Sequence, residues 1–183
     1  INVMELANTK VASNKEVQSL LAAIGLKLGE EPKNLRYGKI LIYTDQDHDG
    51  MSIAGLLLNF FAKYWPELFE EGRICKVETP LVVAKKGKST EVFYSEREFQ
   101  TWLQKTKNVK SWDVEYKKGL AALENIEYKD IIQSPKIFTF MKGKEFNDTF
   151  DSWFAGDSMP RKKKILELSD TETEETETNT GLF

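Results

Sequence analysis

The stretch Lys39-Ile40-Leu41-Ile42-Tyr43-Thr44-Asp45-Gln46-Asp47-His48-Asp49-Gly50 joins an apolar run to three alternating aspartates and a glycine. The apolar half predicts a β-strand that ends at Thr44. Such a strand places Asp45 and Asp47 at its carboxyl end, where open α/β sheets form their ligand crevices. Carboxylates this close repel one another at neutral pH unless a cation or a proton intervenes. Mg²⁺ suits a cluster of hard oxygen ligands, so the stretch predicts a magnesium site.

Three other interpretations of this acidic turn are open. A DxDxDG run also begins the EF-hand calcium loop, but that loop needs a glutamate at its twelfth position and a helix on each side. Counted from Asp45, the twelfth residue is Leu56. In some phosphotransferases the first aspartate of a DxD pair is itself the nucleophile. A solvated turn rich in Asp and Gly, with no chemistry, also fits the spacing.

Helix signals flank the acidic turn on both sides. Ser13 and Glu16 form a candidate capping box, and the apolar residues that follow at helical spacing end at Gly25, a typical helix stop. On the other side, Gly50 is expected to supply the sharp turn into the next helix. A second apolar stripe with helical spacing follows, which we interpret as core packing. It consists of Ile53, Leu56, Leu57, Phe60 and Tyr64.

Expected strands alternate with expected helices in the rest of the chain. Ser95 and Glu98 repeat the capping-box spacing at the start of one of these helices. Strands interleaved with helices predict an α/β fold with a mostly parallel sheet that is covered by helices on both faces. The expected strands are residues 75–84, 91–94 and 112–116, with a polar turn at 85–88, and a further helix is expected at 123–132.

Composition is that of an ordinary globular protein. The 183 residues fit one domain with a sizeable core, and 40% are hydrophobic and 30% charged. No apolar run approaches the ~20 residues of a membrane span, and no secretory signal is visible. The single cysteine, Cys75, excludes an internal disulfide and lies in an expected strand, so it is interpreted as a small core residue in a protein of a reducing compartment.

Charge is unevenly distributed along the chain. Residues 1–166 hold 26 basic and 23 acidic residues, whereas the remainder holds six acids and no bases. A mildly basic body is compatible with DNA contact, although it does not establish it. The low-complexity run 170–178 has no apolar period and is predicted to be disordered.

The acidic turn is part of a longer string of characteristic segments. In order and spacing, the chain from about Asn2 to about Lys164 closely resembles the Toprim region of type IIA DNA topoisomerases, the class of gyrase, eukaryotic topoisomerase II and T4-like phage enzymes. The residues in these segments are more similar to those of the eukaryotic and T4-like phage enzymes than to those of bacterial gyrase. The resemblance implies the Toprim fold, a Rossmann-like α/β arrangement. The segments that carry it are 35–39, the acidic turn, 56–61, 65–68, 72–74, 78–82 and 116–120.

The resemblance also implies the metal ligands. Asp45 would be shared between two Mg²⁺ positions and Asp47 would hold the second ion, with Asp49 matching a third family acid. Mn²⁺ or Ca²⁺ are expected substitutes. The family's upstream glutamate, which supports acid–base chemistry, and its nucleophilic tyrosine have no counterpart here, so no catalytic residue is expected in this chain. His48 is interpreted as a packing or solvent residue.

Four residues are implied to contact double-stranded DNA. Asn2 matches a DNA-contacting family position, and Lys118 lies in a segment similar to the family's K-G-L-G loop, in which Ala121 replaces the second glycine. Arg161 and Lys162 open a basic segment with two open interpretations, contact with phosphates and a link to a following domain. Contacts of such side chains with phosphates would add affinity but no sequence preference.

The resemblance divides the chain into a Toprim domain at 1–134 without its first strand, an extension at 135–166 leading toward a DNA-cleavage domain, and an acidic tail at 167–183. It implies a subunit or excised fragment of an ATP-dependent enzyme, inactive alone, in a two-fold assembly with ATPase-bearing and tyrosine-bearing domains or subunits. An intracellular location is expected, the nucleus if eukaryotic and the bacterial cytoplasm if phage-like, with no membrane partner. Two other functions stay open: a Toprim module of a nuclease or primase, and a non-catalytic assembly scaffold.

Overall fold

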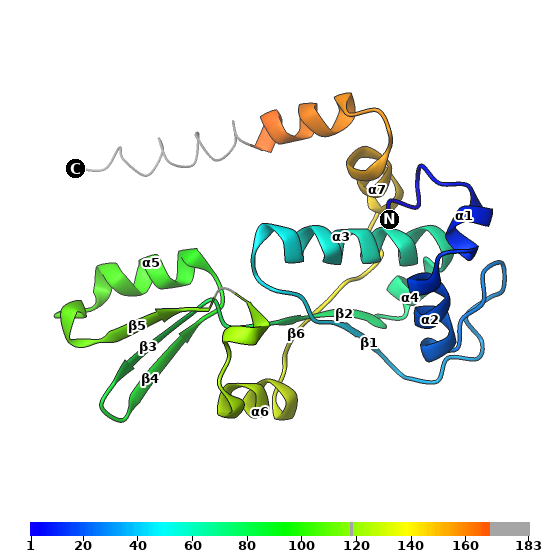
Figure 1. The fold of residues 1–183 in the computed structure, drawn as a ribbon. Coiled ribbons are helices and arrows are strands. Elements are labelled where there is room, and N and C mark those ends of the chain that lie inside the picture. Colours follow the sequence, from blue (N-terminus) through cyan, green and yellow to red (C-terminus); the bar gives the residue numbers. More distant parts are fainter. Residues whose placement is uncertain (118, 169–183) are drawn as a thin grey trace.

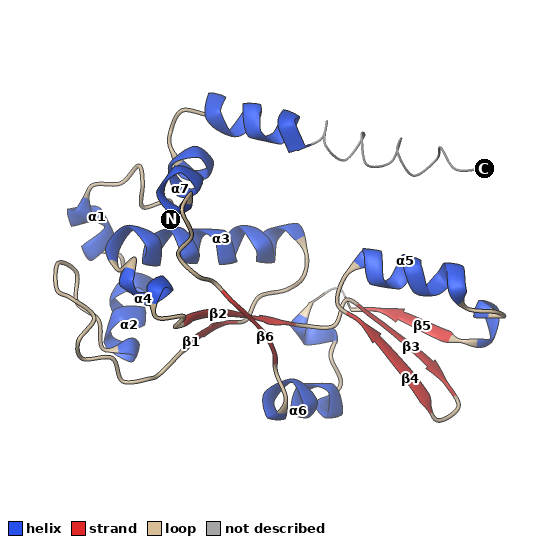
Figure 2. Cartoon of the chain, turned by 180° about the vertical axis from the view of Figure 1, so that it is seen from behind, coloured by secondary structure: helices blue, strands red, loops and turns tan. Residues whose placement is uncertain are grey.

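Two small sheets organise the chain, as the computed structural model of residues 1–117 and 119–168 shows (Figure 1). Helices accompany both sheets, so the mixed α/β class is confirmed (Figure 2). The first sheet has the order β1-β2-β6 and contains β1 (Ile40–Ile42), β2 (Ile74–Glu78) and β6 (Lys136–Thr139). The second has the order β4-β3-β5 and contains β3 (Val82–Lys86), β4 (Ser89–Phe93) and β5 (Asp113–Tyr116).

The predicted mostly parallel sheet is wrong for the described residues. Of the four strand pairings there, only β1 with β2 is parallel, and the other three are antiparallel. In the second sheet, the antiparallel pairing of β3 with β4 has a local cause. Only two residues, Gly87 and Lys88, connect these strands, and so short a loop joins only antiparallel strands. Gly87 has a φ of 59°, a left-handed value that glycine adopts without strain.

The expected strand 75–84 is two strands that belong to different sheets. The break falls at Thr79 and Pro80, where the backbone leaves β2 and enters β3. Proline lacks the N–H that a central strand must donate, so it is suited to this crossing point. Cys75 lies in β2 and is fully buried, as predicted.

The first predicted helix is present, with a different N-cap. α2 (Lys15–Ile24) begins after Asn14, whose side-chain oxygen accepts a hydrogen bond from the Val17 amide at 3.0 Å. The predicted cap, Ser13, is instead the C-cap of α1 (Asn8–Ala12), and its hydroxyl donates to the Lys10 carbonyl. Gly25 ends α2 in the left-handed conformation with a φ of 88°, as predicted.

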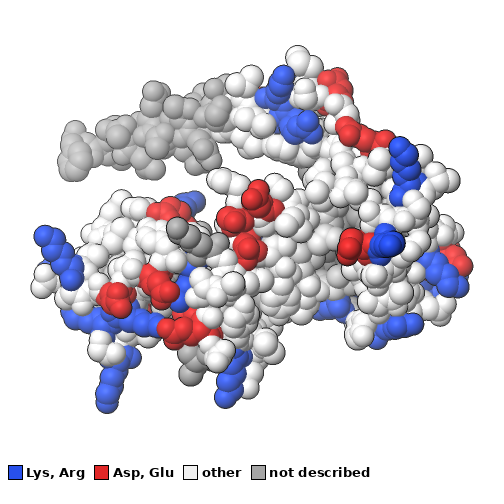
Figure 3. Space-filling view, viewed as in Figure 1, with Lys and Arg blue, Asp and Glu red and all other residues white. Residues whose placement is uncertain are grey.

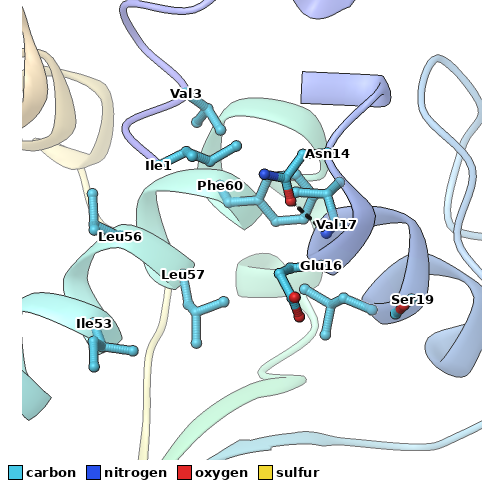
Figure 4. Close-up of a pocket in the computed structure, with 11 residues that line it drawn as sticks. Ile1, Val3, Asn14, Glu16, Val17, Ser19, Ile53, Leu56, Leu57 and Phe60 are labelled. Atoms are coloured by element: carbon cyan, nitrogen blue, oxygen red, sulfur yellow. Dashed lines mark hydrogen bonds between the residues drawn. The ribbon is translucent and has the colours of Figure 1, made fainter. Parts of the chain in front are cut away.

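The long helix α3 (His48–Tyr64) lies along the first sheet (Figure 1). Its apolar stripe was predicted to be core, and this is right for Phe60, which is 4% exposed, but wrong for Ile53, which is 54% exposed. Leu57 is partly buried and packs against the core. Together with Phe60, the residues Ile53, Leu56 and Leu57 line an open apolar groove of about 560 Å³ between α3 and α2 (Figure 4). The main core lies at the other end of α3, around Phe61, Trp65, Leu68, Phe69 and Ile74.

The remaining helices complete both layers. The predicted cap at Ser95 is confirmed, since the Glu98 amide donates to Ser95 Oγ at 3.2 Å. The Glu98 carboxylate accepts from the Tyr94 amide at 2.7 Å, one residue before the amide that a capping box uses. The helix that Ser95 caps packs through Phe99 on the second sheet. The remaining helices are α4 (Glu67–Glu70), α5 (Glu96–Lys105), which Ser95 caps, α6 (Asn125–Gln133) and α7 (Phe146–Phe154). Two 3-10 turns lie at Val109–Ser111 and Leu120–Ala122, and residues 159–168 are also helical.

The segment that follows the predicted boundary at residue 134 is continuous with the first sheet. Its β6 pairs with β2, and Phe154 at the end of α7 lies so close to Gly55 of α3 that an added Cβ there would be 3.3 Å from the ring. The predicted disorder of 170–178 concerns residues outside the described part of the chain. Within the described residues, no helix is long and apolar enough to cross a membrane.

The capping assignment predicts unequal effects of two neighbouring substitutions. Asn14→Ala removes the bond to the Val17 amide and is expected to lower the free energy of unfolding by about 1 kcal/mol. Ser13→Ala removes only an exposed bond within α1 and serves as the matched control, with an expected change below about 0.5 kcal/mol. Urea unfolding measures the free energy of unfolding of both variants. A larger decrease for Ser13→Ala than for Asn14→Ala would show that Ser13 is the N-cap.

Candidate metal centre

The turn after β1 is built around a helix cap. Asp47 is the N-cap of α3, and its Oδ1 accepts a hydrogen bond from the Gly50 amide at 2.7 Å. A carboxylate at a helix N-terminus also interacts favourably with the helix dipole. Because α3 already begins at His48 and a strand precedes the turn, the segment is no EF-hand loop with flanking helices.

Gly50 is required by space rather than by its backbone conformation. An added Cβ at this position would lie 2.1 Å from the carbonyl oxygen of Asp45. The chain therefore folds back on itself between Asp45 and Gly50, and the backbone of Asp45 lies against the first turn of α3. Gly50 was predicted to supply the turn into this helix, but it lies within the first turn of α3, and the chain turns before it. Glycine is required there by close backbone approach.

Asp45 contacts a loop that is distant in sequence. Its Oδ1 accepts a hydrogen bond from the backbone amide of Leu120 at 2.6 Å, and an added Cβ at Gly119 would lie 3.0–3.1 Å from the Asp45 carboxylate. The loop after β5 therefore lies directly against the first aspartate. Sequence reasoning placed this loop near DNA but missed its contact with Asp45, for which glycine at position 119 was the only signal.

The other predicted ligands lie beside Asp45 at the surface. Asp47, His48 and Asp49 are exposed, and Asp45 is half-buried. Acidic side chains gather on the face where α3 begins (Figure 3). Residues 1–117 and 119–168 contain no group of three or more His, Cys, Asp or Glu side chains arranged to hold a metal ion. The Mg²⁺ ligands Asp45, Asp47 and Asp49 therefore stay a prediction.

Two observations fit a hard cation at this place. Asp45 and Asp47 offer carboxylate oxygens, the ligands that Mg²⁺ prefers, and each carboxylate can accept more than the single hydrogen bond described for it. The adjacent Thr44 is 7% exposed, and its hydroxyl has no hydrogen-bond partner among the described residues. A buried hydroxyl left unpaired costs free energy, so this end of β1 suits a bound polar group.

Asn2 was predicted to contact DNA, and its amide makes internal contacts. The Nδ2 donates to the Phe154 carbonyl at 2.7 Å, and the Oδ1 accepts from the Asn59 side chain at 3.0 Å and from the Met4 amide at 3.1 Å. Asn2 therefore ties the beginning of the chain to α3 and α7. Contact with DNA stays a prediction for this residue.

Two of the predicted basic contacts, Arg161 and Lys162, lie in the last described helix. Arg161 donates to the Trp153 carbonyl at 2.7 Å through one of its five N–H groups, and Lys162 is exposed. Both therefore remain predicted DNA contacts. Lys118 lies outside the described residues.

Comparisons with known proteins agree with the fold. Residues 77–181 match the family described as the C-terminal associated domain of TOPRIM. DNA topoisomerase 2-beta of Gallus gallus is 40% identical over 136 residues, which are 71% of this chain and 8% of that protein. DNA topoisomerase 2 of Plasmodium falciparum (isolate K1 / Thailand) is 32% identical over 175 residues, which are 91% of this chain and 12% of that protein.

A solved structure gives the same result. The DNA-binding, cleavage and re-ligation domain of Plasmodium falciparum topoisomerase II matches 89% of this chain and 23% of its own chain, with a TM-score of 0.79 and 31% identity. The chain therefore belongs to the family of the C-terminal associated domain of TOPRIM. More particularly, it is a Toprim region of the type IIA DNA topoisomerase kind. It spans less than a quarter of the length of these relatives.

The close approach at Gly50 predicts a large effect of one methyl group. Gly50→Ala places a Cβ against the Asp45 carbonyl, where the backbone must shift, and is expected to lower the free energy of unfolding by about 1–3 kcal/mol. Gly38→Ala is the control, because nothing lies within 4 Å of its added Cβ. Denaturant unfolding compares the two, and equal stability would contradict the tight turn.

Proposed function

We propose that this chain is a working part of an ATP-dependent type II DNA topoisomerase and supplies the carboxylates that bind Mg²⁺ during double-strand cleavage and religation. The observation that carries the proposal is the position of Asp45, held at the carboxyl end of β1 by the Leu120 amide, in a chain similar to topoisomerases over 71–91% of its length. The relatives also favour a topoisomerase over a nuclease or primase module.

The chemistry to be supported is an in-line displacement at a DNA phosphorus. A divalent ion bound here would stabilise the negative charge on the attacked phosphate and on the leaving 3′ oxygen. Asp45 and Asp47 would hold it, and Asp49 at the start of α3 would act through water or through structure. The nucleophilic tyrosine and the glutamate that assists proton transfer would come from other parts of the complete enzyme.

Asp45 and Asp47 are prepared for this task by the bonds that they already make. The Leu120 amide restrains one oxygen of Asp45, and the Gly50 amide restrains one oxygen of Asp47. Restrained carboxylates need less ordering when a cation binds, and such preorganisation favours binding. Mn²⁺ and Ca²⁺ carry the same charge and accept oxygen ligands, so we propose them as substitutes for Mg²⁺.

Double-stranded DNA would be the substrate, since the matched Plasmodium domain is described as binding, cleaving and religating DNA. Arg161, Lys162, Lys118 and Asn2 would contribute contacts with DNA. We further propose that ATP is bound elsewhere in a two-fold assembly of ATPase-bearing and tyrosine-bearing domains or subunits. An intracellular location follows from this substrate, and the nucleus applies if the source is eukaryotic.

The double role of Asp47 allows metal binding to be separated from helix capping. Asp47→Asn keeps a side-chain oxygen for the Gly50 amide, so stability is expected to change little while Mn²⁺ affinity falls by more than about tenfold. Asp47→Ala is expected to lose affinity and also about 1 kcal/mol of stability. Mn²⁺ titration followed by electron paramagnetic resonance measures affinity, and urea unfolding measures stability. An unchanged Mn²⁺ affinity in both variants would remove Asp47 from the site.

Reconstitution tests the activity itself. The chain, combined with ATPase-bearing and tyrosine-bearing topoisomerase partners, is expected to decatenate DNA only with ATP and Mg²⁺. Asp45→Ala is expected to abolish Mg²⁺-dependent cleavage and to leave the assembly intact in size-exclusion chromatography. Cleavage that persists in Asp45→Ala would contradict the proposed metal role, and assembly without any cleavage by the unaltered chain would favour a scaffold.

A further inference from the structure

A buried lysine lies beneath the loop that contacts Asp45. Lys117 follows β5 directly and is 2% exposed. Its ammonium group lies 2.8 Å from a carboxylate oxygen of Glu115 and 3.2 Å from one of Glu127, and it donates to the Ala122 carbonyl at 3.2 Å. A buried charge is costly unless it is paired and hydrogen-bonded, and here all three partners lie in or next to one loop.

The same loop is also held from α6. The carboxylate of Glu127 accepts a hydrogen bond from the Glu124 amide at 2.7 Å, so one side chain joins the buried ammonium to the end of the loop. The hydroxyl of Tyr128 donates to the Leu120 carbonyl. Residues 119–124 are thus fixed at their beginning by Tyr128, in the middle by Lys117 and at their end by Glu127.

The contacts that hold residues 119–124 fix the position of the Leu120 amide. Leu120 directs its N–H to Asp45 at 2.6 Å, while Gly119 allows the backbone to lie against the same carboxylate. The Leu120 N–H shares its peptide unit with the Gly119 carbonyl, which accepts a hydrogen bond from the Ala122 amide at 3.0 Å. The Leu120 carbonyl on the other side of the residue is held by Tyr128, and the Ala122 carbonyl by Lys117, so this N–H has little freedom to turn away. The orientation of Asp45 therefore depends on groups that do not touch it.

We propose that Lys117 and Glu127 form an ion-pair clamp that positions the Leu120 amide and thereby orients Asp45 for metal binding. This inference rests in part on the proposed function, because Asp45 is the metal ligand in it. Lys117 and Glu127 are positioning residues, and they act through the loop rather than on DNA or metal.

Lys117 keeps its charge in this position. Burial by itself lowers the pKa of the ammonium group, but the hydrogen bonds with Glu115 and Glu127 outweigh that effect and raise the pKa above the ordinary lysine value. The group is therefore protonated at neutral pH, and so the clamp is an ion pair under the conditions of the enzyme. The pKa of Glu115 is lowered in turn by its hydrogen bond with Lys117.

The test uses the full chain with Mn²⁺ as the probe. Lys117→Met and Lys117→Met/Glu127→Gln are compared with Lys85→Met, which removes an exposed lysine paired with Glu124 at 3.3 Å in the same region. The double variant leaves no buried charge unpaired, so it keeps the test open if the single variant does not fold. The readouts are hydrogen exchange of the Leu120 amide and the Mn²⁺ dissociation constant.

Both Lys117 variants are expected to exchange the Leu120 amide at least about tenfold faster and to bind Mn²⁺ about 10–100-fold more weakly, as is usual when a partner of a metal ligand is lost. Lys85→Met is expected to change neither quantity. A purely structural role would lower the unfolding midpoint and leave both quantities unchanged in the folded protein, and that result would overturn the clamp. If the unaltered chain binds no Mn²⁺, the proposed function fails, while hydrogen exchange at Leu120 still decides whether the clamp exists.

Discussion

The hydrogen bond from the Leu120 amide to Asp45 is the contact on which the candidate site depends. Asp45 follows β1 of the first sheet, and Leu120 lies in the loop after β5 of the second, so this bond joins the two sheets where the aspartates lie. Two glycines make the approach feasible, since a Cβ at Gly50 would meet the Asp45 backbone and one at Gly119 would meet its carboxylate. Residues that follow strands of both sheets therefore form the candidate site.

Local sequence patterns predicted the strands, helix caps and helix stops that depend on interactions between neighbouring residues. The strand before Asp45, the stop at Gly25 and the cap at Ser95 are all present, because each depends on neighbouring residues. The strand ends at Ile42, two residues before the predicted end at Thr44. The Toprim resemblance was also confirmed, since it rests on a long ordered string of segments that the family match and the topoisomerase relatives independently support.

The features that were missed depend on contacts between distant segments. Strand direction is an example, because nothing within residues 136–139 indicates that β6 pairs antiparallel with β2. The cap at Asn14 depends on Ser13 being used by the preceding helix, and the exposure of Ile53 depends on how α2 and α3 diverge. The contact of Leu120 with Asp45 spans 75 residues, a separation that no short pattern reports.

In the proposed site, Asp45, held by the Leu120 amide, and the neighbouring Asp47 share a divalent cation. Anomalous X-ray diffraction from crystals of the chain grown with Mn²⁺ tests it most directly. We expect an anomalous peak bound by the carboxylate oxygens of both aspartates, with the bond from Leu120 to Asp45 retained. A peak elsewhere, or Asp45 turned away from Leu120 to bind the ion, would contradict it.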